Sequence, residues 1–217
     1  MTITRRELLA GCGAGLTSAA LPAPVFAAPK HTYDLVPVQV ADGLWMIEGS
    51  TDYFTSENGG AIVNCALLDT ADGLVIVDTG PSRRYGEALQ EIAKTLNGRG
   101  VAALFNTHHH PDHFFGNQVF PGKPVYALGE TKALAAAEGD GFADNMYRLL
   151  GDWMRGTEPV PPADEITSSI MEIGGRKLRT LPLSGHTGAD LALLDEKTGT
   201  LIAGDLAFLD RAPTTPH

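Results

Sequence analysis

Four of the chain's seven histidines lie in one short stretch, Asn106–His113, which also contains an aspartate. Neutral imidazole and carboxylate groups are the nitrogen and oxygen ligands that zinc prefers, at about 2.0–2.2 Å. The apolar residues Val101–Phe105 predict a buried strand, so the stretch lies where a strand ends in a loop. A histidine tag would lie at a terminus and would not follow such a strand. The stretch therefore predicts a metal site.

The spacing within this loop predicts two directions for its side chains. His108 and His110 are two residues apart in an extended segment, so both should point to the same side. Pro111 turns the chain because its ring fixes φ. Asp112 and His113 should then face another direction. One loop can thus offer two ligands to one metal and two to a neighbouring position.

Three more polar residues follow predicted strands elsewhere in the chain: Asp78, His186 and Asp205. Side chains from several strand ends can converge at one edge of an α/β layer. Each residue also has an ordinary alternative. His186 alone would suit a buried, hydrogen-bonded histidine, Asp205 a cap, and Asp78 an acid at the start of a helix.

The pattern His108-x-His110-x-Asp112-His113 resembles the H-x-H-x-D-H motif of the metallo-β-lactamase-fold hydrolases. The resemblance implies an α/β fold, the αββα sandwich, with metal ligands at one shared edge. It also implies that His108, His110 and His186 bind a first metal, Asp112 and His113 a second, and that Asp205 bridges the two. Asp78 would accept the free N–H of a ligating imidazole and fix its orientation. His109 alternates away from its neighbours and is predicted to be a non-ligand.

The predicted chemistry is hydrolysis. Two zinc ions about 3.5–4 Å apart can share a hydroxide at neutral pH and polarise the bond that it attacks. Asp112 would be the catalytic residue that orients this nucleophile. Gly-x-Ser-x-Gly is absent, and Cys65 lies within a predicted strand, which favours a role in the core.

The resemblance also has two departures. The family usually has a last histidine on the second metal well beyond the bridging acid, whereas here the only histidine after Asp205 is the terminal His217. We therefore expect a C-terminally truncated domain with an incomplete C-terminal half. The Gly-Asp pair ending at Asp205 favours a glyoxalase-II-like thioesterase pattern over true metallo-β-lactamases. Residues 208–217 resemble exported members associated with quinoprotein systems.

Residues 1–27 have the features of a secretory signal. Arg5 and Arg6 precede an apolar run rich in alanine and glycine, and small residues follow it, which suggests the twin-arginine route. A membrane anchor is disfavoured because glycine and proline break the run. Lipidation at Cys12 is disfavoured because the apolar run follows the cysteine. We expect a periplasmic or secreted domain over residues 28–217 with one cysteine, so no internal disulfide.

The chain of 217 residues suits one domain, and its formal charge of −10 argues against binding a nucleic-acid backbone. A small-molecule substrate is expected, either an ester, a thioester or a lactam. Two alternatives stay open. One is an iron-dependent oxidoreductase similar to persulfide dioxygenases, and the other is a non-catalytic, metal-binding periplasmic partner of a quinoprotein system.

Strands and turns should position these residues. Glycine-containing turns predict hairpins over residues 35–47, 61–77, 168–183 and 191–203. Pro81 is expected to open a helix ending at Asn97-Gly98. A second helix is expected over Glu130–Trp153, interrupted at Gly139–Gly141. Four apolar side chains at helical spacing are expected in its core face: Phe142, Met146, Leu149 and Trp153. The polar loop 49–60 carries two adjacent aromatic residues, Tyr53 and Phe54, which suit either a substrate flap or a plain surface loop.

Overall fold

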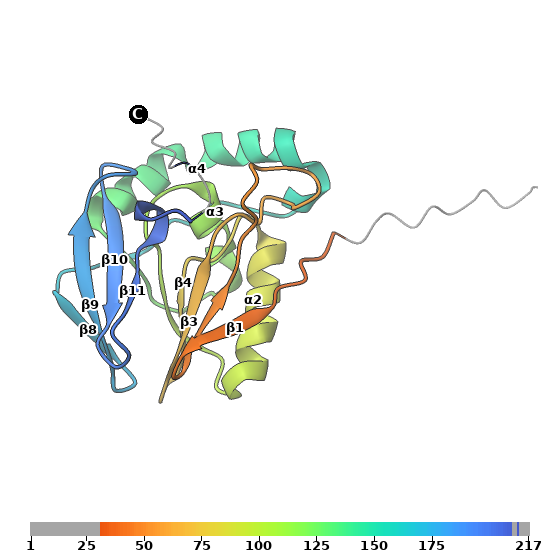
Figure 1. The fold of residues 1–217 in the computed structure, drawn as a ribbon. Coiled ribbons are helices and arrows are strands. Elements are labelled where there is room, and N and C mark those ends of the chain that lie inside the picture. Colours follow the sequence, from red (N-terminus) through yellow and green to blue (C-terminus); the bar gives the residue numbers. More distant parts are fainter. Residues whose placement is uncertain (1–30, 210–211, 213–217) are drawn as a thin grey trace, which may run out of the picture. The chain divides into compact units, whose positions relative to one another are not determined.

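Two β-sheets form the body of the protein in the computed structural model, which describes residues 31–209 and residue 212 (Figure 1). Sheet A contains, in spatial order, β1 (Pro37–Ala41), β2 (Leu44–Ile47), β3 (Cys65–Thr70), β4 (Gly73–Val77), β5 (Val101–Phe105), β6 (Val125–Ala127) and β7 (Asp164–Glu165). Sheet B contains β11 (Thr200–Ile202), β10 (Asp190–Asp195), β9 (Arg176–Leu183) and β8 (Ile170–Ile173).

The strand directions follow from the lengths of the connections. Short turns join β1 to β2 and β3 to β4, and these pairs are antiparallel. The helix α2 (Arg83–Asn97) joins β4 to β5, and that pair is parallel, as a crossover connection requires. All pairs in sheet B are antiparallel. The four predicted hairpins and the layered α/β architecture are therefore confirmed.

Both faces of the central strands of sheet A are buried. Leu67 and Ile76 pack with Leu89 of α2 on one face. On the other face, Leu68 and Val75 belong to a second cluster that includes residues of sheet B. The core thus lies both between the two sheets and between sheet A and α2. A strand buried on both faces has a continuous apolar sequence, which β4 has.

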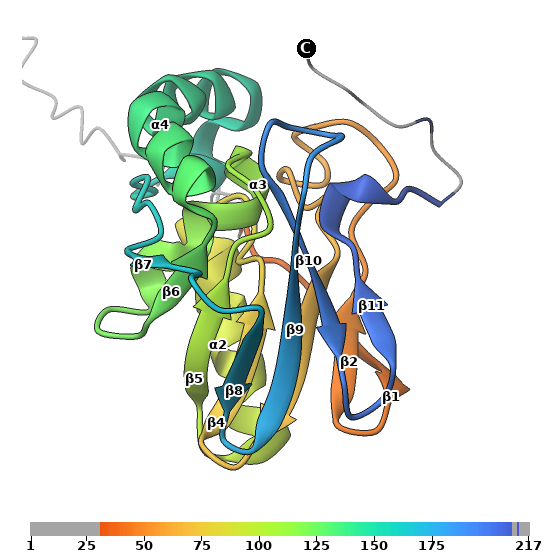
Figure 2. The ribbon, with the colours of Figure 1, turned by 90° about the vertical axis from the view of Figure 1, so that its left-hand side faces the viewer.

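The remaining helices lie near one end of the two sheets (Figure 2). These are α3 (Pro111–Phe114), α4 (Gly129–Leu150) and three short 3₁₀ segments, η1 (Phe115–Val119), η2 (Gly151–Met154) and η3 (Gly204–Leu206). A third apolar cluster, which includes Phe114, Met146 and Leu150, packs α3 against α4. These elements surround the end of the sheets at which the predicted site residues lie.

Two predicted helix features are wrong. The first helix begins at Arg83 rather than at Pro81, because the Ser82 side chain accepts a hydrogen bond from the Tyr85 N–H and caps the helix. The second helix, α4, continues without interruption through Gly139 and Gly141. Glycine lowers helix stability but does not break a helix that is packed along its length.

The predicted export signal in residues 1–27 and the terminal His217 lie outside the described residues. Within the described part of the chain, none of the helices has the length and apolar character needed to cross a membrane.

Candidate metal centre

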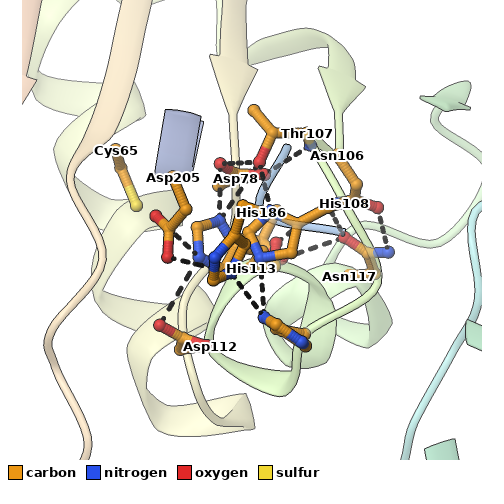
Figure 3. Close-up of polar contacts among 12 residues, drawn as sticks. Cys65, Asp78, Asn106, Thr107, His108, Asp112, His113, Asn117, His186 and Asp205 are labelled. Atoms are coloured by element: carbon orange, nitrogen blue, oxygen red, sulfur yellow. Dashed lines mark hydrogen bonds and ion pairs between the residues drawn. The ribbon is translucent and has the colours of Figure 1, made fainter. Parts of the chain in front are cut away.

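The predicted ligands come together at one end of the sheets, although they come from distant parts of the chain (Figure 3). His108 and His110 follow β5, and His113 lies in α3. His186 follows β9, and Asp205 lies in η3 after β11. The predicted convergence of ligands at strand ends therefore agrees with the observed positions.

Three imidazole rings form the first group. The Nε2 atom of His108 lies 3.0 Å from Nδ1 of His110, and the Nε2 atom of His186 lies 2.9 Å from the same Nδ1 atom. His108 and His186 are buried, and His110 is partly exposed. This is the set that the sequence assigned to one metal.

A second group adjoins the first. His108, His113 and Asp205 each offer a ligand atom within 4.8 Å of the others. The Nε2 atom of His113 lies 3.4 Å from Asp205 Oδ1 and 3.5 Å from Asp112 Oδ2. The other oxygen of Asp205, Oδ2, lies 3.5 Å from Nε2 of His186. Asp205 thus lies close to His113 of its own group and to His186 of the first group, which suits a bridging acid.

Asp78 lies behind the second group and contacts His113 from the opposite side of the ring. Its Oδ2 atom is 2.8 Å from His113 Nδ1. The backbone N–H of Thr107 donates a hydrogen bond to Oδ1 and the Thr107 hydroxyl donates one to Oδ2, both 2.8 Å long. With φ at 63°, Asp78 occupies the left-handed region, which aspartate tolerates better than most residues. Its carboxylate leaves Nε2 of His113 directed toward the pocket.

Several residues that support the site were not predicted from the sequence. The Thr107 hydroxyl lies 3.0 Å from His108 Nδ1 and 3.2 Å from His113 Nδ1. Asp190 accepts hydrogen bonds from the backbone N–H groups of His186 and Thr187, and so shapes the loop that carries His186. Asp190 lies four residues after His186, and this short spacing is the sequence signal from which the contact could have been predicted.

Buried amides hold the histidine loop in place. The side chain of Asn117 donates a hydrogen bond of 2.8 Å to the side-chain oxygen of Asn106. Asn106 in turn donates one of 2.9 Å to the His113 carbonyl. Both amides are buried, so these bonds fix α3 relative to the end of β5.

The charges of the site follow from burial and crowding. Burial, followed by the neighbouring imidazoles, lowers the pKa of His110 to about 3 and that of His108 well below its usual value. Burial alone would lower the pKa of His113, but nearby carboxylates raise it well above the usual value. Burial raises the pKa of Asp112 to about 6. Burial alone would also raise the pKa of Asp205, but the neighbouring imidazoles of His113, His186 and His110 together lower it to about 2.

These residues fit a divalent cation. His110 Nδ1 faces two other imidazole nitrogens at close range, and in a neutral ring this atom has only one lone pair or one hydrogen for the two contacts. The buried Nε2 atom of His113 makes no hydrogen bond within the described part of the chain. A cation would accept lone pairs from all of these atoms, and the combination of imidazole and carboxylate donors suits zinc.

All residues of the two metal groups except His108 line a pocket of about 930 Å³. Tyr53 and Phe54 of the predicted loop also line it, as a substrate flap would. Leu149 of α4 lines the pocket and is 57% exposed, so the prediction that this side chain belongs to the core is wrong. Cys65 is fully buried near Tyr85, as expected for a core position.

His109 lies in the same loop but belongs to neither metal group of the described chain. Its ring centroid lies 5.0 Å from that of His110, but its Nε2 atom is 3.5 Å from Glu138 Oε2 on α4. This position is the one expected for a non-ligand.

Comparison with known proteins gives one family. The sequence profile described as the metallo-beta-lactamase superfamily matches residues 58–217. A curated hydroxyacylglutathione hydrolase from Synechococcus sp. (strain JA-2-3B'a(2-13)) is 28% identical over 141 residues, which cover 64% of this chain and 46% of that protein. The uncharacterized protein YobT from Bacillus subtilis (strain 168) is 27% identical over 158 residues, which cover 66% of this chain and 61% of YobT. The chain thus spans about half the length of these curated relatives.

Solved structures show the same fold. The metallo-beta-lactamase from Pontibacter korlensis has a TM-score of 0.65 and 22% identity, with 84% of this chain and 77% of that chain covered. The metallo-beta-lactamase from Hirschia baltica has a TM-score of 0.55 and 20% identity, with coverage of 77% and 69%.

Proposed function

The chain belongs to the metallo-beta-lactamase superfamily, and we propose that it is an exported, zinc-dependent hydrolase of a small ester, thioester or lactam. The observation that carries this proposal is the convergence of three imidazole nitrogens beside a second group of imidazole and carboxylate, of which all residues but His108 line one pocket. The curated relatives that are named as hydrolases support the reaction class.

The two groups suit two divalent ions. In our proposal, three histidines would hold the first ion, Asp112 and His113 would hold the second, and Asp205 would be shared by the two sites. The three histidines are His108, His110 and His186. Bound zinc would supply Lewis acidity that activates water near neutral pH and polarises the bond under attack.

The protein itself positions the reacting groups. Asp78 accepts the Nδ1–H of His113, so Nε2 keeps its lone pair for the metal. Asp112 reaches the same pocket and would orient the attacking water by accepting a hydrogen bond from it. This chemistry requires no serine or cysteine nucleophile, which agrees with the burial of Cys65.

The proposal is tested by hydrolysis assays on the metal-loaded protein with a chromogenic ester, a thioester and a chromogenic cephalosporin. We expect turnover of at least one substrate, loss of turnover after chelation, and recovery with zinc. His186→Ala and Asp112→Ala should each lower kcat/KM by more than about 100-fold, because each removes a group at the reacting atoms.

His109→Gln is the matched control, because it replaces an imidazole of the same loop that belongs to neither metal group. It should keep most of the activity. Iron near stoichiometry in protein purified without added metal would contradict zinc and favour the oxidoreductase alternative. Metal binding without turnover of any substrate would contradict the hydrolase and favour a non-catalytic partner.

Export is the second part of the proposal and depends on the paired arginines near the N-terminus. Fractionation of a bacterial host should find the protein in the periplasm. Replacing Arg5 and Arg6 together by lysine should retain it in the cytoplasm, and unchanged export would contradict the twin-arginine route.

A further inference from the structure

The pocket beside the metal groups has mainly apolar walls. Phe142 of α4 lies with its ring centroid 6.2 Å from that of His110, and Phe208 lies 6.0 Å from His186. Phe54 and Leu149 line the same space. A group bound next to the reacting atoms would therefore contact aromatic and aliphatic side chains from several elements.

Apart from the imidazoles of the site, the charged side chains in these walls are acids. Among the described residues that line the pocket, there is no lysine and no arginine. The acids are Asp112 and Asp205 of the metal groups and the exposed Glu48. The whole chain also carries a formal charge of −10. A carboxylate on the substrate, away from the reacting bond, would find no cationic side chain here.

Burying such a carboxylate without a partner is costly, and Glu48 would repel it. An uncharged acyl group, in contrast, is stabilised by the apolar surface that it buries against these walls. Resting on the hydrolase function proposed above, we propose that the pocket selects substrates with an uncharged, apolar acyl group and rejects substrates with an anionic one.

A matched pair of esters tests this inference on the metal-loaded protein. 4-Nitrophenyl hexanoate and the mono-4-nitrophenyl ester of adipic acid differ only in a terminal methyl or carboxylate group. After subtraction of uncatalysed rates, kcat/KM should be at least about tenfold higher for the hexanoate, with the difference mainly in KM. Equal values, or faster turnover of the adipate ester, would overturn the proposal.

Two lysine substitutions on α4 sharpen the test. Leu149 lines the pocket and is 57% exposed, whereas Tyr147 is 55% exposed and does not line it. Leu149→Lys should raise kcat/KM for the adipate ester, relative to the hexanoate, by about three- to fivefold, because it places a cation in the wall. Tyr147→Lys adds the same charge on the same helix and should leave the ratio unchanged. Equal effects of the two substitutions would contradict selection by the pocket wall.

Arg211 lies outside the described residues, so Arg211→Ala is measured as well. A selective loss of adipate-ester turnover in this variant would overturn the proposal, because it would reveal a cation that serves the substrate.

Binding of inert amide analogues separates this inference from the hydrolase proposal. Hexananilide and adipanilic acid repeat the two acyl groups and can be titrated into the metal-loaded protein by calorimetry. If neither ester is hydrolysed but hexananilide binds at least about tenfold more tightly, the hydrolase proposal fails and the selectivity of the pocket stands. Tighter binding of adipanilic acid would overturn the selectivity whatever the activity.

Discussion

Asp78 is buried behind the site and forms a hydrogen bond of 2.8 Å with His113. Asp78→Asn should keep the fold, because asparagine also tolerates the left-handed backbone at this position. It removes the charge that orients the imidazole, so we expect zinc affinity to fall about 10- to 100-fold. Competition with a chromophoric chelator measures this change directly.

Asp72→Asn provides the control for charge alone. Asp72 is exposed in the turn between β3 and β4, so this substitution changes the net charge equally but leaves the site intact. Zinc affinity should be unchanged in this variant. If both variants bind zinc as tightly as the parent protein, Asp78 does not orient a ligand.

At the residue scale, the sequence predicted the candidate ligands, with His186 and Asp205 supplied by the family resemblance, but it missed the residues that support them. His108, His110 and His113 were predictable because a single loop carries their spacing. Thr107 and Asp190 were not, because their roles depend on hydrogen bonds that only the folded chain creates. Leu149 was wrongly predicted to be in the core because its spacing along the helix matches that of core residues. Spacing alone does not show that a pocket lies beside the helix.

At the scale of elements, α4 offers a matched pair of glycines. Gly141 is exposed, and a Cβ atom added there would meet nothing within 4 Å. Gly141→Ala should therefore raise the free energy of unfolding by about 0.5–1 kcal/mol, since alanine loses less backbone entropy in a helix. Urea unfolding of the metal-free protein measures this gain.

Gly139→Ala makes the same chemical change two residues earlier but should give no gain. A Cβ atom there would lie 2.9 Å from Pro159 Cβ, so the connection after α4 would have to move. Stabilisation by both alanines to the same extent would contradict this close contact. The pair also explains why the predicted break in the helix was wrong, because Gly139 allows the connection to pass close to an intact helix.

The hairpins were predictable because their turns carry glycine at the right spacing, as at Gly174-Gly175. The pairing of β4 with β5 followed from the intervening helix. The assignment of strands to two sheets did not follow from any local pattern, because it depends on which apolar faces meet in the folded chain.

At the scale of the whole molecule, Arg176 connects the two sheets. Its guanidinium donates hydrogen bonds of 2.9 and 2.7 Å to the two carboxylate oxygens of Asp195 in sheet B. The same side chain donates bonds of 2.6 and 3.1 Å to the carbonyls of Gly43 and Asp69, at the turn and strand end of sheet A. Both charged side chains are buried. Sequence spacing could not predict this network, because it joins residues from four separate parts of the chain.

Arg176→Met should lower the free energy of unfolding by about 3 kcal/mol at pH 7, because it leaves Asp195 buried without its cationic partner. Urea unfolding of the metal-free protein measures the loss. The double variant Arg176→Met/Asp195→Asn removes the unpaired charge and should recover part of the loss. If the double variant is less stable than Arg176→Met, the cost does not come from a buried, unpaired carboxylate.

The same ion pair sets a pH dependence of stability. Burial alone would raise the pKa of Asp195, but its hydrogen bonds from Arg176 and Thr198 lower it below the usual value. A carboxyl group with a lowered pKa stabilises the fold above its unfolded pKa of about 3.9, and this contribution is lost as the pH falls through the folded value. In Arg176→Met, Arg176 no longer lowers the pKa of Asp195, and burial favours the protonated carboxyl group. The difference in unfolding free energy between parent and variant should therefore be largest near neutral pH and shrink as the pH falls toward about 3. Urea unfolding curves of both proteins at each pH measure this difference. A difference that stays constant or grows in acid would show that the Arg176–Asp195 pair does not carry the stability assigned to it.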